Sequence, residues 1–169
     1  MAKTKLKGND VNLIGNEVKV GDKAPEVKIV GKDLADIAVG GAKDKVQLIV
    51  AVPSLDTPVC AAETRKFNEE AAKIDGVEVI VVSMDLPFAM GRFCTIEGIE
   101  ALSVGSDFRN KDFANAYGVL IADGPLAGVS ARAIFVVNKN GEITYKQIVP
   151  EITEEPNYQE AIEAAKAAI

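Results

Sequence analysis

The amino-acid sequence predicts an α/β fold with a central mixed β-sheet and helices on both faces, and three observations predict it. First, Val46–Val52 and Val77–Val82 are apolar, β-branched runs typical of strands buried on both faces of a sheet. Second, Pro58–Lys73 between them has the pattern of a helix, so the three segments form a βαβ unit with parallel strands. Third, the apolar strand Ala133–Val137 runs into the hairpin turn Asn138–Gly141, which requires an antiparallel return.

Shorter strands are expected before the βαβ unit. Thr4–Lys7 and Val11–Ile14 flank the turn cluster Gly8–Asp10, which predicts an N-terminal β-hairpin extension within residues 1–18. Two more short strands follow this hairpin, and they are expected at Val27–Val30 and Asp36–Val39.

The remaining elements alternate helix and strand. Gly118 occupies a position that favours a left-handed C-cap, so a helix should end just before it. The expected elements are the helices Pro87–Glu97 and Asn110–Tyr117, the strand Glu142–Ile148, and a closing helix from Glu155 or Pro156 to Ile169. We find no linker or internal repeat, and 169 residues suit one domain at the usual size of about 150 residues. Residues 1–169 are therefore expected to form a single domain.

Composition excludes several classes of function. A net charge of −6, from 19 basic and 25 acidic residues, argues against a general affinity for nucleic acid. Histidine is absent, which excludes Ser-His-Asp and Cys-His catalysis and any histidine metal site. No apolar run approaches the length of a membrane span, and the start MAKTKLKGND lacks the apolar segment of a secretory signal. We therefore expect a cytoplasmic protein.

Cys60 lies where a helix is predicted to begin. Thr57 suits the N-cap, Pro58 the first helical position, and Cys60 then falls in the first turn, where free N–H groups favour an anion. The thiolate is the reactive form of cysteine, and an ordinary thiol with a pKa of about 8.5 is only about 3% ionised at pH 7. A helix N-terminus stabilises an anion by only about 0.3–1 kcal/mol. A buried arginine is the natural further contributor, although spacing alone does not identify it.

Cys94 is the second cysteine, 34 positions after Cys60. Each follows a strand of the same βαβ unit, so both belong to the edge of the sheet where sites assemble. Both could instead be small buried core residues. A structural disulfide is not expected in a reducing compartment, and two distant cysteines without histidine do not make a zinc site. No phosphate-binding loop or CxxC motif occurs, and nothing supports a paired-carboxylate hydrolase.

Four segments together resemble a known family. Pro53–Cys60 resembles the PxxxTxxC signature of peroxiredoxins, and Val82–Cys94 resembles the segment that marks their bacterial thiol peroxidase subfamily. Ser130–Val137 resembles the strand that carries the active-site arginine of that subfamily, and Val20–Pro25 is similar to its opening. The resemblance extends in order and spacing over nearly the whole chain.

The resemblance implies a thioredoxin-like fold and an atypical two-cysteine peroxidase. Cys60 would be the peroxidatic nucleophile, and Cys94 the resolving thiol that forms an intrachain disulfide with it. Thr57 would hydrogen-bond the thiolate and the peroxide, Pro53 would shield the pocket from water, and Arg132 would stabilise the thiolate and the developing charge.

The resemblance also implies the partners. The substrates would be hydrogen peroxide and organic (alkyl) hydroperoxides, the reductant thioredoxin, and the assembly a homodimer without metal or organic cofactor. Two other functions remain open: a non-enzymatic thioredoxin-like redox sensor or binding module, and a protein disulfide exchanger, against which the lack of CxxC argues. Since a disulfide needs Cα atoms within about 7 Å and both cysteines fall on predicted helices, we expect one helix to unwind on oxidation.

Overall fold

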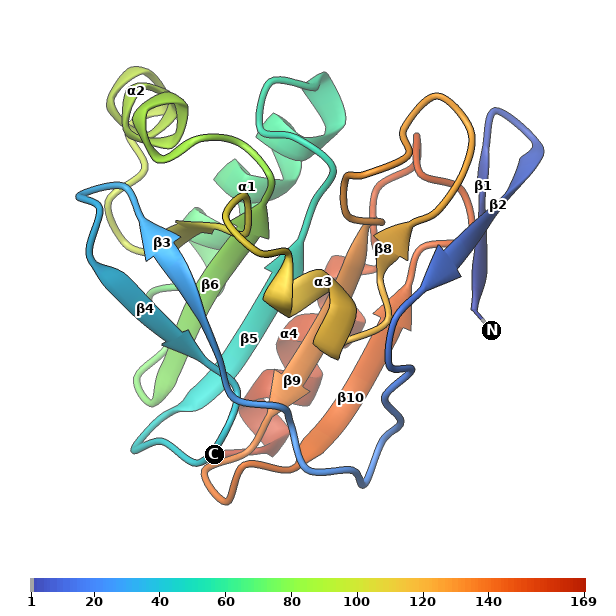
Figure 1. Cartoon of the computed structure of the whole chain (residues 1–169). Helices are drawn as coiled ribbons and strands as arrows, with labels where there is room; N and C mark the ends of the chain where they lie inside the picture. Colours follow the sequence, from blue (N-terminus) through green and yellow to red (C-terminus); the bar gives the residue numbers. More distant parts are fainter. Residues whose placement is uncertain (1) are drawn as a thin grey trace.

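The computed structural model describes residues 2–169, so Met1, part of the expected N-terminal extension, lies outside the described residues. These residues form two sheets, with strand orders β1-β2-β8 and β10-β9-β5-β6-β7-β3-β4 (Figure 1). The strands are β1 (Lys3–Leu6), β2 (Asn9–Ile14), β3 (Val27–Gly31), β4 (Asp36–Val39), β5 (Val46–Ala51), β6 (Val77–Ser83), β7 (Ser103–Ser106), β8 (Leu120–Ile121), β9 (Ala133–Val137) and β10 (Ile143–Ile148). The helices are α1 (Pro58–Glu70), α2 (Pro87–Glu97), α3 (Asp112–Ala116) and α4 (Tyr158–Ala167).

The centre of the larger sheet confirms the predicted mixed topology. β5 and β6 pair in parallel from Val46 opposite Val77 to Ala51 opposite Val82, with α1 as the crossover between them. β9 pairs antiparallel with β5, and β10 returns antiparallel to β9. The two apolar runs are therefore the middle of the sheet, where both faces are covered.

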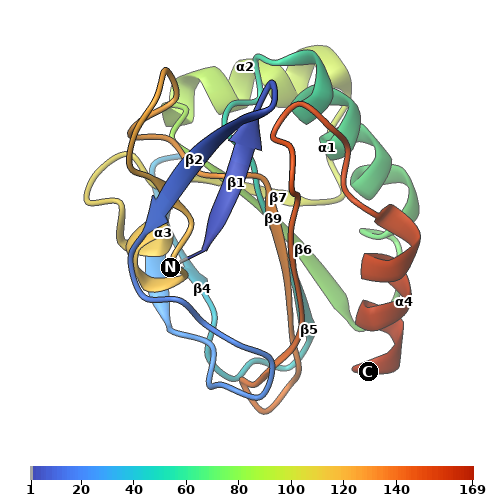
Figure 2. The same cartoon turned by 90° about the vertical axis from the view of Figure 1, so that its right-hand side faces the viewer.

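The two faces of the central strands bury against different layers. Leu48 and Val50 of β5 belong to one hydrophobic core, which includes residues of α1, α2 and α4. Ile49 and Ala51 belong to the other, which includes residues of α3 and of the N-terminal hairpin. Figure 2 shows α1 and α4 on one side of the sheet and α3 and β2 on the other. The expected helices on both faces are confirmed.

The turn of the N-terminal hairpin differs from the prediction. β1 and β2 pair antiparallel with Leu6 opposite Asn9, so the loop consists of Lys7 and Gly8 rather than Gly8–Asp10. Both loop residues have positive φ, 49° and 83°. A two-residue turn of this kind matches the twist of the flanking strands, and this geometry prevailed over the preference of Asn and Asp for the turn.

Two strands were not predicted, and three helices are shorter than expected. β7 and β8 lack an apolar alternation, and β7 is held by its pairing with β6 and β3. α1 ends at Glu70 rather than Lys73, α3 covers only Asp112–Ala116, and α4 covers Tyr158–Ala167. Gly118 follows the C-cap of α3 with a φ of 68°, as predicted. None of the helices within residues 2–169 is long and apolar enough to cross a membrane.

The carboxyl ends of β5 and β6 lie at one end of the larger sheet. From there the chain enters α1 and α2, which carry the two cysteines (Figure 1). Ile169 lies against Gly76, just before β6 begins, and so belongs to the opposite end of the sheet.

Candidate active site

Cys60 lies in the first turn of α1 and is completely buried. Thr57 is the N-cap and Pro58 the first helical residue, as predicted. The Thr57 hydroxyl makes no capping hydrogen bond to the helix, and it donates instead to the carbonyl oxygen of Ser54 at 2.9 Å. The backbone thus has the predicted helix start, while the side chain of Thr57 turns back to the preceding loop.

Arg132 approaches Cys60 from the residue before β9. Its Nη1 lies 3.2 Å from the Cys60 Sγ, and its Nε donates to the carbonyl oxygen of Ile152 at 2.9 Å. The side chain is only 2% exposed, so it is not a surface arginine at a strand end. Burial disfavours its charge, but the neighbouring Cys60 and Glu63 together raise the pKa of Arg132 above its ordinary value. A charged guanidinium therefore contacts the sulfur inside the protein.

Glu63 is a buried acidic residue that sequence reasoning missed. Its Oε2 accepts a hydrogen bond of 2.7 Å from Arg132 Nη1, and its side chain is completely buried. Burial raises the pKa of Glu63 to about 7, although Arg132 acts in the opposite direction. Its spacing of three residues from Cys60 was the available signal, since that spacing places both on one helix face.

Asp85 is a second missed residue, and it holds the loop that leads into α1. Its carboxylate accepts hydrogen bonds from Ser54 Oγ, from the Leu55 backbone N–H and from Ser83 Oγ, each at 2.7 Å. Asp85 lies two residues after the end of β6, and this position at the carboxyl end of a central strand was the signal that could have identified it. Through these bonds the loop of Pro53–Thr57 is tied to β6.

Cys94 lies inside α2 and is 4% exposed. Burial raises the pKa of its thiol, with Lys32 opposing the effect. Both cysteines are free thiols and border the same hydrophobic core. Each is held within an intact helix, so the expectation that both lie on helices is confirmed.

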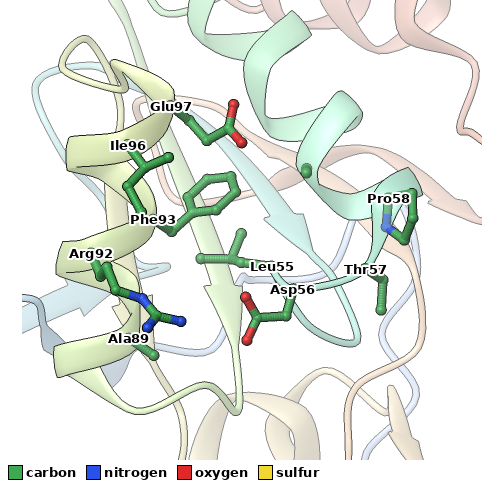
Figure 3. Close-up of a pocket in the computed structure, with 10 residues that line it drawn as sticks. Leu55, Asp56, Thr57, Pro58, Ala89, Arg92, Phe93, Ile96 and Glu97 are labelled. Carbon is green, nitrogen blue, oxygen red and sulfur yellow. The ribbon is translucent and has the colours of Figure 1, made fainter.

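A first cavity, of about 250 Å³, separates the start of α1 from α2. Figure 3 shows Phe93 and Glu97 of α2 on one side of it, and the side chains of Arg92 and Asp56 projecting into the same space. The cavity thus lies between the two helices that carry the cysteines.

A second cavity, of about 290 Å³, shares Thr57 and Pro58 with the first. Arg132 and Pro53 also line it. Apart from Ser54 and Thr153, its other walls are apolar, and they come from Leu6, Val59, Leu126, Val129 and Ile152. In this second cavity, the apolar cavity, a small molecule can reach the guanidinium beside Cys60.

A buried thiol, a charged guanidinium and an apolar cavity suit nucleophilic chemistry by a thiolate. Among residues 2–169, no group of three or more His, Cys, Asp or Glu side chains is arranged to hold a metal ion.

Comparison with known proteins agrees with this chemistry. The family described as Redoxin matches residues 19–162. The "Thiol peroxidase" of Aquifex aeolicus (strain VF5) is 58% identical over 170 residues, covering the whole of both chains. That of Campylobacter jejuni is 58% identical over 157 residues, covering 93% of this chain and 89% of its own.

Solved structures confirm the thioredoxin-like fold. A peroxiredoxin-like protein from Aquifex aeolicus superposes with a TM-score of 0.97 at 56% identity, covering 100% of this chain and 98% of its own. A thiol peroxidase from Chromobacterium violaceum superposes with a TM-score of 0.87, covering 98% of this chain and 95% of its own. Because the two sequences are only 20% identical, this likeness concerns the fold alone. The chain therefore belongs to the Redoxin family and, within it, to the thiol peroxidases, and is a thiol-dependent, peroxiredoxin-type oxidoreductase.

Proposed function

We propose that the protein reduces hydrogen peroxide and alkyl hydroperoxides with the Cys60 thiolate as nucleophile. The observation that carries this proposal is the contact of 3.2 Å between Arg132 Nη1 and Cys60 Sγ, made where both side chains are buried. A guanidinium in such a site favours the thiolate over the thiol, because a charge-assisted hydrogen bond is strong away from water.

In the proposed first step, the Cys60 thiolate attacks the terminal oxygen of ROOH. The S–O bond forms, the O–O bond breaks, and the alkoxide that leaves takes up a proton to become ROH, so that Cys60 becomes a sulfenic acid. Arg132 faces the charge that spreads over S–O–O in the transition state. Thr57 already donates its hydroxyl proton to Ser54, so its lone pairs remain to accept the hydroperoxide O–H. Pro53, buried in the cavity wall, excludes water.

The apolar cavity supports activity on alkyl hydroperoxides. A volume of about 290 Å³ lined mainly by apolar side chains can take an alkyl group, whose burial is favourable by about 0.8 kcal/mol per CH₂ group. Hydrogen peroxide lacks this contribution, so we expect a higher KM for it.

In the proposed second step, the Cys94 thiol condenses with the Cys60 sulfenic acid, releases water and leaves the intrachain Cys60–Cys94 disulfide. Thioredoxin then restores both thiols by exchange. A helix at each cysteine supports the expectation that α1 or α2 unwinds first. We further propose that residues 1–169 act as one domain, that the protein is a cytoplasmic homodimer, and that it needs no metal or organic cofactor.

The test is NADPH consumption in the presence of thioredoxin, thioredoxin reductase and cumene hydroperoxide. We expect turnover by the wild type, none by Cys60→Ser, and at most one turnover by Cys94→Ser. An inactive wild-type protein with two titratable thiols would contradict the proposal.

A further inference from the structure

The strongest unexplained feature is the buried carboxyl of Glu63. It lies one helical turn after Cys60, and both side chains are completely buried. Its Oε2 contacts Arg132 Nη1 at 2.7 Å, while its Oε1 has no hydrogen-bond partner among the described residues. A buried ionised carboxylate normally has its oxygens satisfied, because an unsatisfied charged group costs more than an unsatisfied neutral one.

One guanidinium nitrogen serves two acidic groups. Arg132 Nη1 contacts Cys60 Sγ at 3.2 Å and Glu63 Oε2 at 2.7 Å. If Cys60 and Glu63 both ionised, two negative charges would share one positive charge in a site closed to water. Like charges in such a site raise the cost of the second ionisation.

Among residues 2–169, the other groups that act on the charge of Glu63 include no second cation. Glu155, in the segment before α4, disfavours a negative charge on Glu63. Tyr158 of α4 also lies near Glu63, and the charge of Glu63 is one of the causes that raise the pKa of this tyrosine. Arg132 is therefore the cation for which Glu63 and Cys60 compete.

We propose that Glu63 is a positioning residue that shares a single proton with Cys60. When the Cys60 S–H bond breaks, an O–H bond forms on Glu63, so the reactive enzyme holds a thiolate and a neutral carboxylic acid beside Arg132. No electrons are transferred in this step. It rests on the proposed role of Cys60 as nucleophile, and it explains how a chain without histidine stores the proton that the thiol gives up.

Sharing has a consequence for titration. Cys60 and Glu63 should lose their two protons in two separate steps, because ionisation of one group makes ionisation of the other harder. Neither step can be assigned to one residue alone. Removing the carboxyl should leave the whole charge of Arg132 to the thiolate. A residue that merely held Arg132 in place would have the opposite effect, since its loss would free the guanidinium to move away.

The experiment titrates the ultraviolet absorbance of the thiolate in the Cys94→Ser background, with and without Glu63→Gln. We expect the midpoint to move down by about one pH unit and the transition to become a single step. Glu70→Gln, at an exposed glutamate of the same helix, is the control and should leave the midpoint in place. An unchanged or raised midpoint in Glu63→Gln would overturn the proposal.

A second measurement needs no change at Glu63. Infrared spectra of the wild type near pH 7 should contain the carbonyl band of a buried protonated carboxyl, and this band should be weaker in Cys60→Ser because no thiolate competes for Arg132. A band that persists unchanged in Cys60→Ser would also overturn the proposal. Neither readout depends on turnover, so a protein that lacked peroxidase activity could still support or contradict the shared proton.

Discussion

Arg132 makes three contacts that are each specific to its guanidinium. It reaches Cys60 and Glu63 through Nη1 and the carbonyl oxygen of Ile152 through Nε, all within the protein interior. A lysine in its place would supply charge but not this planar set of donors. These contacts therefore fix the orientation of the guanidinium, and with it the place where the positive charge meets Cys60.

The first prediction concerns the charge at this position. Arg132→Gln should slow the reaction with peroxide roughly 100- to 1,000-fold, because a preorganised donor facing developing charge is lost. The thiolate titration should move to higher pH, with the fold retained. Stopped-flow measurement of single-turnover oxidation checks the rate. Arg109→Gln, at an exposed arginine after β7, should leave both quantities unchanged, and an equal effect there would contradict the role of Arg132.

The second prediction concerns the pH dependence of stability at Glu63. The ordinary pKa of the Glu63 carboxyl is 4.5, and burial raises it to about 7 in the folded protein. The folded state therefore binds this proton more tightly than the unfolded state does. This contribution to the free energy of unfolding is fully present below about pH 4.5 and is lost as the pH rises through about 7. Wild type should therefore gain stability relative to Glu63→Gln as the pH is lowered over this range. Urea denaturation checks this, and parallel pH curves would refute it.

At the scale of elements, the start of α1 depends on a loop that is anchored elsewhere. Asp85, after β6, accepts hydrogen bonds from Ser54 and Leu55, and these fix the loop that ends at Thr57. The position of the Cys60 sulfur is thus set by the neighbouring strand as well as by its own helix.

The third prediction follows from this anchor. Asp85→Ala should lower the free energy of unfolding by about 1–3 kcal/mol, because the donors of Ser54 and Leu55 lose their partner. It should also slow peroxide reduction. Asp85→Asn should lose less, since its amide oxygen still accepts. Denaturation together with single-turnover kinetics checks both effects. Asp44→Ala, at an exposed position before β5, serves as the control, and equal losses in the two alanine variants would contradict the anchor.

The fourth prediction concerns the release of α2. Arg65 of α1 pairs with Glu97 at the end of α2 at 2.9 Å, and both are partly exposed. Such pairs stabilise by about 0.2–1 kcal/mol, so Glu97→Gln should speed disulfide formation by about 1.4- to 5-fold if α2 must move first. Rapid quenching with a thiol-alkylating reagent after one equivalent of peroxide measures this rate. Glu100→Gln should have no effect, and an unchanged rate in Glu97→Gln would argue for unwinding of α1 instead.

At the scale of the whole molecule, the N-terminal hairpin is joined to the segment that supports Arg132. The Lys5 carbonyl oxygen accepts from the Ile152 N–H at 2.8 Å, while the Ile152 carbonyl accepts from Arg132. Glu151 also binds the hairpin, by accepting from the Gly8 N–H at 2.8 Å. One hydrogen-bond network therefore connects the N-terminal hairpin, the segment of Glu151 and Ile152, and the guanidinium of Arg132.

The fifth prediction tests this network with pH. The Gly8 N–H, and then that of Thr153, lower the pKa of Glu151 to about 2, so its contribution is present above the ordinary pKa of 4.5 and is lost as the pH falls toward 2. Amide exchange at Gly8 should accelerate over this range beyond the intrinsic trend. Glu151→Gln should remove the extra acceleration, and identical pH profiles for the two proteins would contradict the role of Glu151.

The sequence predicted the elements whose signal is local. β5, β6 and β9 are long apolar runs, and the Asn-Gly turn after β9 has a specific backbone requirement. β7, with sequence SVGS, has no such signal, and its place in the sheet depends on β6 and β3. The strand at β7 is therefore determined by its pairing with neighbouring strands and not by its local sequence pattern.

The residues of the candidate site also differ in whether the local sequence identifies them. Cys60 was identifiable from the start of its helix, and Arg132 only through family resemblance, because 72 positions separate two groups that the fold brings into contact. Glu63 was missed because an acidic residue on a helix is ordinarily a solvated one. Only the packing of α1 against the sheet shows that this glutamate is buried.

The two ends of the chain differ in their distance from the site. Leu6 of the hairpin forms part of the wall of the apolar cavity, whereas Ile169 lies against Gly76 at the far end of the sheet. Attachment to an electrode or a fused partner through the last residue would therefore leave open the apolar cavity, which we propose as the entrance for peroxide. Attachment through the first residues would bring bulk to the rim of that entrance, so an immobilised peroxide sensor built from this protein should be tethered at its C-terminus.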